Sequence, residues 1–299
     1  MFVPQRIIFE KGALNYEIGK NIYQEFKNKE KTEIINLTNN KDKEHIPGDN
    51  IRDFYKEGKN TLVVGVKKGY KFQSCKPSAH WQLPLFSGCL GNCQYCYLNT
   101  NLGDKPYIKV NVNIDDILDR SKGYMDERKP KITIFEGSGT SDPIPVEPYT
   151  HSLKRAIEFF AKSEYGRFRF VTKFDDVDTL LDIEHRGKTE ARFAINTIKV
   201  IEDYRNLLIY LNEKIPNNLE HPITFEVISH RYTTRAKNII NEVFPDNILP
   251  MKDDDRTYKY GQFGYGKFVY PKENLAYMKK IFTENIEEIF PDAEIKYII

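Results

Sequence analysis

The residue types best suited to chemistry are gathered in one stretch, FSGCLGNCQYCYLNT, at residues 86–100. Three of the chain's four cysteines lie there, Cys89, Cys93 and Cys96, with the spacing C-x3-C-x2-C. Thiolates bind zinc or iron–sulfur clusters. Three cysteines do not complete a four-ligand site. The spacing therefore indicates either a fourth protein ligand elsewhere or an open position that a substrate or cofactor fills.

Both possibilities have a candidate in the sequence. The fourth cysteine, Cys75, lies upstream, and together with the other three it would give a zinc site with four thiolate ligands. The alternative is a 4Fe-4S cluster held by three cysteines, with an open position on its fourth iron. Tyr95 directly precedes the last cysteine, and the loop follows the first strand of a βα series. These two features favour the cluster.

The elements that must position this loop alternate between strand and helix patterns, which is typical of parallel βα units with right-handed crossovers. We expect strands at 80–88, 131–139, 167–174, 190–197 and 223–229, and helices at 112–121, 149–164, 177–185, 201–215 and 233–244. About five strands predict an α/β fold with an incomplete parallel (β/α) barrel rather than a closed one of eight strands. Chemistry in such folds lies at the C-terminal strand ends, where GSGTSDP (137–143), TKFDD (172–176) and INT (195–197) fall together with the cysteine loop.

Two further regions flank the barrel, which we place at residues 76–245. Residues 1–75 are expected to form a small α/β lead-in, and residues 246–299 a β-hairpin and a terminal helix. The hairpin segment RTYKYGQFGYGKFVYPK (256–272) carries four basic residues and no acidic one, interleaved with aromatic residues and glycines.

The net charge and the hydrophobic pattern limit the partners and the location that we expect. The formal net charge of +2 over 299 residues is nearly balanced, so affinity for nucleic acid has to come from a local patch. No apolar run approaches a membrane span, and the N-terminus lacks the pattern of a signal peptide. We therefore expect a cytosolic protein without a membrane partner, whose cysteines stay reduced.

Several blocks of sequence beyond the cysteine loop lie in order from residue 76 to near the C-terminus. They are KPSAHWQLPLFSGCLGNCQYCYLNTNLGDKPYIKVNVN, FEGSGTSDP, FVTKF, ITFEVISHRYT, KYGQFGYGKFVYPK and FPDAEIKYI. In these blocks the chain resembles the spore photoproduct lyases of the radical S-adenosyl-L-methionine (SAM) superfamily. The resemblance implies that SAM fills the open position on the cluster. It also implies a 5′-deoxyadenosyl radical that repairs the spore photoproduct, a methylene-bridged thymine dimer made by UV light in spore DNA.

The resemblance assigns roles to matching residues. Cys89, Cys93 and Cys96 would hold the cluster, and Tyr97 would help to return the radical. The SAM contacts would be Tyr95, Ser141, Lys173 and Asn196. The hairpin would enter the lesion through Arg256, Tyr258, Lys259, Tyr260 and Lys267. Each of these assignments has a non-functional alternative. Tyr95 and Tyr97 would then only pack within the loop, Lys173 would be a solvated side chain at a strand end, and the hairpin would be a solvated sheet edge without a role in DNA binding.

The resemblance also implies partners and a location. The partners would be UV-damaged DNA and a one-electron reductant such as a flavodoxin or ferredoxin. We expect a monomer that works in the cytoplasm of the spore core of an endospore-forming bacterium.

The sequence departs from the family pattern at two places. Gly139 stands where the best-known members carry a cysteine that donates hydrogen to the thymine radical. Our hypothesis is that Cys75 replaces it, and the alternative is an inert buried thiol. Moreover, the region after INT is short by about one βα unit, roughly 30–40 residues. The competing functions are therefore a radical SAM enzyme with another substrate and a catalytically impaired DNA-binding relative.

Overall fold

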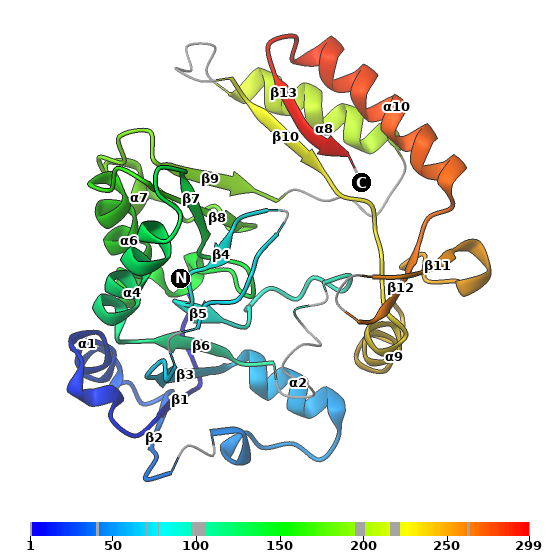
Figure 1. Ribbon diagram of the computed structural model, residues 1–299. Coiled ribbons are helices and arrows are strands. Elements are labelled where there is room, and N and C mark those ends of the chain that lie inside the picture. Colours follow the sequence, from blue (N-terminus) through cyan, green and yellow to red (C-terminus); the bar gives the residue numbers. More distant parts are fainter. Residues whose placement is uncertain are drawn as a thin grey trace. The chain divides into compact units, whose positions relative to one another are not determined.

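The computed structural model describes residues 2–39, 42–69, 71–76, 78–96, 98, 106–194, 201–215, 222–261 and 264–298 (Figure 1). The chain divides into two compact units, Met1–Ile195 and Asn196–Ile299. Among the described residues, no helix is both long and apolar enough to cross a membrane.

The first sheet of unit 1 has the strand order β2-β1-β3-β6-β5. Its strands are β1 (Arg6–Phe9), β2 (Glu33–Asn36), β3 (Thr61–Gly65), β5 (Phe86–Ser87) and β6 (Ile108–Asn111), and only the β5–β6 pair is antiparallel. The helices around it are η1 (Ala13–Asn15), α1 (Glu17–Phe26), η2 (Asp42–His45) and α2 (Ile51–Lys59). All five residues of β3, TLVVG, are buried, as expected for a parallel strand covered on both faces. Because β5 and β6 belong to this sheet, the N-terminal layer extends well beyond residue 75.

The second sheet of unit 1 is the barrel part, with four parallel strands in the order β4-β7-β8-β9. They are β4 (Trp81–Gln82), β7 (Thr133–Glu136), β8 (Gly166–Thr172) and β9 (Thr189–Phe193). The intervening helices are α4 (Ile114–Asp126), η3 (Ile144–Val146), α5 (Glu147–Thr150), α6 (Ser152–Ala161) and α7 (Asp178–Leu181). Fully buried aromatic rings join sheet to helix, with Phe160 stacked on Phe168 at a centroid distance of 5.6 Å. The predicted incomplete parallel barrel is confirmed.

Unit 2 contains two small sheets (Figure 1). In one, β10 (Thr224–Val227) pairs in parallel with β13 (Glu294–Ile298), beside α8 (Ile201–Lys214) and α10 (Lys272–Ile289). In the other, β11 (Thr257–Tyr260) and β12 (Gly266–Val269) form an antiparallel hairpin near α9 (Thr234–Val243) and η4 (Asp253–Asp255). The hairpin and the terminal helix are confirmed. The pairing expected for the strand at 223–229 is corrected: in the described residues β10 pairs with β13, because their apolar side chains share one cluster with α8 and α10.

Candidate active site

The cysteine loop begins directly after β5. A buried lysine, which the sequence did not indicate, binds the backbone of this loop. Lys59, the last residue of α2, is buried, and its Nζ donates to the backbone carbonyls of Cys89 and Gly91, the second at 2.8 Å. Burial lowers the pKa of Lys59 from its usual value, while the three neighbouring cysteines act in the opposite direction. The loop is therefore fixed through its backbone, which leaves the cysteine sulfurs available as ligands.

The sulfur atoms of the loop converge on one another. The backbone N–H of Gly91 donates to Cys89 Sγ at 3.3 Å, and a Cβ placed on Gly91 would lie 3.4 Å from Cys89 Sγ and 3.6 Å from Cys93 Sγ. The backbone N–H of Leu98 donates to the sulfur of Cys96. Such N–H···S bonds stabilise thiolate charge and are among the features that set cluster potentials.

This arrangement fits a cluster better than a single ion. No group of three or more His, Cys, Asp or Glu residues in the described ranges could hold one metal ion. In a cluster, by contrast, each cysteine binds a different iron, so its sulfurs are spread further apart. Cys75 lies in the field of Glu136, Arg169 and Arg192 rather than of the other cysteines. The described residues therefore do not support the zinc site with four thiolate ligands.

Burial controls the protonation of the cysteine loop. It raises the pKa of Cys89 to about 11 and raises that of Cys96, although the Gly91 N–H and the charge of Lys59 act against the shift at Cys89. The Cys89 thiol is therefore neutral at pH 7, and binding of a metal has to displace its proton.

Ser141, a predicted SAM contact, lies directly beside the start of the cysteine loop. It forms a parallel bridge with Gly88, and the Gly88 N–H donates to the carbonyl of Thr140 at 2.9 Å. The Ser141 Oγ is buried and has no hydrogen-bond partner in the described part of the chain. A buried hydroxyl without a partner costs about 1–3 kcal/mol. A polar ligand at this point would remove that cost, so the position fits a bound cofactor.

Asp142 ties this loop to the next strand end. It is buried, and it accepts hydrogen bonds from Thr172 Oγ1 and from the backbone N–H of Lys173, both at 2.8 Å. Burial raises its pKa, and these hydrogen bonds oppose the shift. The loops after β7 and β8 are thereby held together beside Cys89, whose sulfur lies in the field of this carboxylate.

Lys173 and Tyr95, two further predicted SAM contacts, lie close to each other. Lys173 Nζ donates to the carbonyl of Ala194 at 3.2 Å and is 5.4 Å from the centroid of the Tyr95 ring. The structure therefore brings Tyr95, Ser141 and Lys173 close to the cysteine loop. Tyr97 and Asn196 lie outside the described residues.

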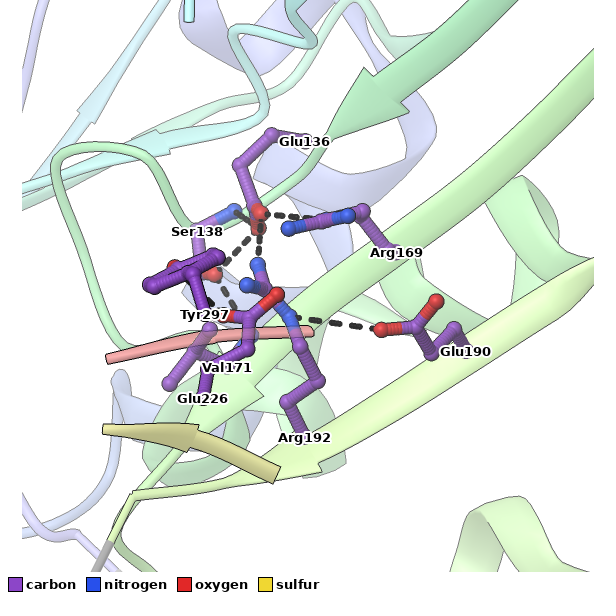
Figure 2. A network of polar contacts seen from close by, with 8 residues as sticks. All are labelled: Glu136, Ser138, Arg169, Val171, Glu190, Arg192, Glu226 and Tyr297. Carbon is purple, nitrogen blue, oxygen red and sulfur yellow. Dashed lines mark hydrogen bonds and ion pairs between the residues drawn. The ribbon is translucent and has the colours of Figure 1, made fainter. Parts of the chain in front are cut away.

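A buried ionic network that sequence reasoning missed joins the strand ends of the barrel (Figure 2). Glu136, at the end of β7, is 2 % exposed and pairs with Arg169 of β8 at 3.3 Å and with Arg192 of β9. Ser138 donates to Glu136 through both its Oγ and its N–H, and accepts from the N–H of Val171. The strand sequences RFRF and EARF alternate charged and apolar residues, and that alternation was the available signal.

Cys75, the hypothesised hydrogen donor, lies in the field of Glu136, and Gly139, the position where the family pattern changes, lies beside Gln82. Cys75 lies in the turn before β4, where its N–H donates to the carbonyl of His80 at 3.4 Å. Burial, with a smaller effect of Glu136, raises the pKa of its thiol to about 11. A Cβ on Gly139 would lie 2.9 Å from the side chain of Gln82, in β4. Residue 139 therefore faces the end of the strand that follows Cys75.

Arg256 differs from the expectation that it contacts DNA. It is 9 % exposed, its Nη1 and Nη2 donate to the carbonyls of His230 and Pro250 at 2.9 and 2.6 Å, and its guanidinium lies 3.5 Å from the ring centroid of Tyr270. These contacts occupy the guanidinium at the base of the hairpin. Arg256 therefore positions the hairpin rather than presenting charge at its surface.

The other hairpin residues are exposed on two distinct faces. Tyr258 and Tyr260 are 58 % and 69 % exposed and share one face, because they are two residues apart on one strand. Lys259 lies directly opposite Lys267 on the other face. Like charges directly opposite each other destabilise a hairpin. A pair of this kind is favourable when an anion lies beside it, so this face fits the phosphates of a nucleic acid.

Comparison with known proteins gives one consistent family. A family model described as spore photoproduct lyase matches residues 2–206 and 198–299. The chain is 45% identical to the spore photoproduct lyase of Clostridium acetobutylicum over 99% of this chain and 98% of that relative, and 39% identical to that of Bacillus subtilis strain 168 over the same shares.

Solved structures agree with the sequence comparison. Spore photoproduct lyase complexed with dinucleoside spore photoproduct matches with a TM-score of 0.93 and 38% identity, over 99% of each chain. A double mutant of spore photoproduct lyase with bound AdoMet and dinucleoside spore photoproduct matches with a TM-score of 0.92 and 37% identity, over 100% of this chain and 99% of that one. In that mutant an alanine replaces a cysteine and a cysteine replaces a serine, at positions 64 residues apart.

The comparisons also bear on the shortened region. The alignment with the Clostridium acetobutylicum relative is 334 positions long, 35 more than this chain has residues. The two segments of the family match overlap at residues 198–206, directly after the INT segment. Both observations agree with a loss of about one βα unit at that point.

Proposed function

Because the chain belongs to the spore photoproduct lyase family, we propose that it is a radical SAM carbon–carbon lyase that converts the spore photoproduct in UV-damaged DNA to two thymines. One observation carries the proposal. The buried hydroxyl of Ser141 has no partner in the described part of the chain, and it lies beside three converging thiols. This combination provides ligands for a cluster and an unmet polar contact next to them.

Each of these groups has a distinct part in holding the cofactors. Cys89, Cys93 and Cys96 would hold the 4Fe-4S cluster, and Tyr95, Ser141 and Lys173 would hold SAM. When bound, the two cofactors supply the 5′-deoxyadenosyl radical. Lys59 keeps the loop backbone in place, and Asp142 keeps the loops after β7 and β8 together. A flavodoxin or ferredoxin is the proposed source of the electron.

Cys75 is the proposed hydrogen donor to the thymine radical. A hydrogen atom is transferred from an S–H group, not from a thiolate, and the raised pKa of Cys75 keeps its proton in place at pH 7. The transfer forms a C–H bond in thymine and leaves a sulfur radical on Cys75. Tyr97 is the proposed relay that would give a hydrogen atom to that sulfur, and the radical left on Tyr97 would take a hydrogen atom from 5′-deoxyadenosine, so that the radical is returned to the cofactor. Cys75 and Gly139 are 64 residues apart, the separation of the two substituted positions in the double mutant described above.

DNA binding is assigned to the hairpin of unit 2. Lys259 and Lys267 would contact phosphates, while the exposed rings of Tyr258 and Tyr260 would fill the space left by a displaced lesion. Arg256 would act through the position of the hairpin. We further propose that the protein works as a monomer in the spore core.

The decisive experiment is one anaerobic assay of the full chain. The protein is reconstituted with iron and sulfide, reduced, and given SAM with or without DNA that contains the spore photoproduct. We expect 5′-deoxyadenosine and restored thymine to appear together. Deoxyadenosine without thymine would mean that the substrate is a different molecule. The absence of both products from a fully loaded cluster would indicate a DNA-binding relative whose shortened region has cost it the SAM site.

A further inference from the structure

A cavity of about 470 Å³ in unit 1 has an unusual concentration of positive charge. Its volume lies within the range of ligand pockets, about 300–1,000 Å³. Among its lining residues are four lysines but only one carboxylate, that of Glu10. Since the whole chain has a net charge of only +2, the lysines of this cavity are a local feature rather than a consequence of composition.

The single carboxylate does not neutralise the cavity. Glu10 pairs with Lys109 of β6, and this ion pair packs over Gly65, where a side chain would collide with both partners. The remaining three lysines are Lys67, Lys68 and Lys71, and no ion pair is seen for them in the described ranges. Three of the four lysines that line the cavity are therefore not matched by its one carboxylate.

The loop that carries these lysines is fixed at both ends. The backbone N–H of Lys67 donates to Asn113 Oδ1 at 2.8 Å, and its carbonyl accepts from Asn113 Nδ2 at 3.2 Å. At the other end, the N–H of Phe72 donates to the Tyr124 hydroxyl at 2.8 Å. The backbone at Lys67 and at Phe72 is therefore already held in place before a ligand binds, which lowers the cost of binding.

The cavity reaches the end of the barrel at which the proposed reaction takes place. Gln82 of β4 and Gly139 also line it. Gly139 stands at the position of the hydrogen donor in other members of the family. Ser141, Lys173 and Tyr95, the proposed cofactor contacts, do not line the cavity. The lysines therefore adjoin the place of the lesion rather than the place of the cofactor.

We propose that this lysine-lined cavity binds a backbone phosphate of the DNA strand that carries the lesion. Lysine ammonium groups act as mobile point charges, which suits a phosphate oxygen. The proposal rests on the proposed function, because the lesion brings the phosphate to this end of the barrel. It adds a second phosphate-binding element to the hairpin, located in unit 1. The same lesion without a phosphate, as a dinucleoside, would gain nothing from it.

The test compares two double variants of the full chain. Lys68→Gln/Lys71→Gln removes two exposed lysines of the cavity, and the control Lys131→Gln/Lys154→Gln removes two exposed lysines elsewhere in unit 1. Binding of a short single-stranded oligonucleotide with the lesion is measured by fluorescence anisotropy at several salt concentrations. Repair of that oligonucleotide and of the dinucleoside is followed in parallel.

We expect the cavity variant to bind the oligonucleotide about tenfold more weakly, with a salt slope smaller by about 0.7, since one lost phosphate contact contributes about 0.7 for a single strand. Repair of the dinucleoside and all properties of the control should stay as in the wild type. Unchanged oligonucleotide binding, or an equal loss on the dinucleoside, would overturn the proposal. If the wild type repairs neither substrate but the binding difference is present, the proposed function fails while the phosphate site stands.

Discussion

The strand ends of unit 1 and the hairpin of unit 2 differ in whether their charged side chains are buried or exposed. At the strand ends of the barrel, the carboxylate of Glu136 is buried and matched by two arginines. On the hairpin, Lys259 and two tyrosines stand in solvent. Yet both sites rest on a buried cation that bonds two backbone carbonyls, Lys59 in unit 1 and Arg256 in unit 2.

The contrast follows from what each site has to do. Radical chemistry needs fixed geometry and exclusion of water, and buried matched charges supply both. Contact with DNA needs charge that phosphate can reach, and such charge has to be exposed. The shared buried cation shows that either kind of site needs a fixed backbone beneath it.

The largest expected effect concerns the cysteine loop. Cys93→Ala removes one of the three proposed ligands, so we expect loss of the cluster and a fall in 5′-deoxyadenosine production of about 1,000-fold or more, which corresponds to about 4 kcal/mol in the barrier. Iron and sulfide content and deoxyadenosine are the measurements. Cys75→Ala serves as the control and should keep its iron. A variant at Cys93 with full iron content would refute the ligand assignment.

Removal of the proposed donor should separate two steps that normally occur together. In Cys75→Ala we expect deoxyadenosine to form while the yield of intact thymine falls about tenfold, or about 1.4 kcal/mol. Adding Gly139→Cys should restore the yield, since the atoms nearest to the new Cβ belong to the flexible side chain of Gln82. Normal thymine yield and purity in Cys75→Ala would show that this thiol is inert.

The buried cation of unit 2 should matter more for stability than the exposed charge above it. Arg256→Ala leaves two carbonyls without their donors and removes the ring contact with Tyr270. We expect a loss of about 3 kcal/mol in the free energy of unfolding. Lys259→Ala should change it by less than about 0.5 kcal/mol. Denaturant unfolding monitored in unit 2 would measure both variants. Equal losses of unfolding free energy in the two would contradict the proposed structural role of Arg256.

The pair of lysines on the hairpin should lower the stability of the hairpin and raise its affinity for DNA. Lys259→Gln/Lys267→Gln removes two phosphate contacts, and we expect about tenfold weaker binding of lesion-containing DNA with a lower salt slope. The same change relieves repulsion across the strands and should stabilise the hairpin by about 0.5 kcal/mol. Anisotropy titrations and thermal unfolding are the measurements. Weaker binding together with a destabilised hairpin would point to a structural role for these lysines.

A last expected effect is a pH dependence of stability within unit 1. Burial raises the pKa of Glu147 from 4.5 to about 7, even though its carboxylate accepts hydrogen bonds from the N–H groups of Leu153 and Lys154 at the start of α6. Between these two pH values the folded protein binds more protons than the unfolded chain, so stability falls as the pH rises. The slope should not exceed about 1.4 kcal/mol per pH unit.

The measurement is the unfolding free energy of Glu147→Gln between pH 4.5 and 7. We expect a flatter profile than in the wild type, whereas the control Glu158→Gln, at an exposed position of α6, should leave the profile unchanged. An unaltered slope in Glu147→Gln would assign the pH dependence to another group.

The parts of the site that follow from local pattern were predictable. The spacing of the three cysteines, the alternation of strands and helices and the basic aromatic hairpin are all written in short segments, and the structure contains the elements that they predict. Arg256 was misjudged because it lies in the same basic run as Lys259, and local sequence does not reveal which of the two side chains turns inward.

By itself, the sequence determined the family, the three-cysteine loop, the parallel βα order and the change from cysteine to glycine at residue 139. Each of these depends on residue identity and spacing alone. Only the tertiary structure decided the pairing of β10 with β13, the role of Lys59 beneath the cysteine loop and the meeting of Glu136 with two arginines. Those features join residues that are between 30 and 71 positions apart in the chain, and Glu226 and Tyr297 have the largest separation (Figure 2). Contacts at such separations depend on how the chain packs, because burial selects which distant charges and apolar faces come together.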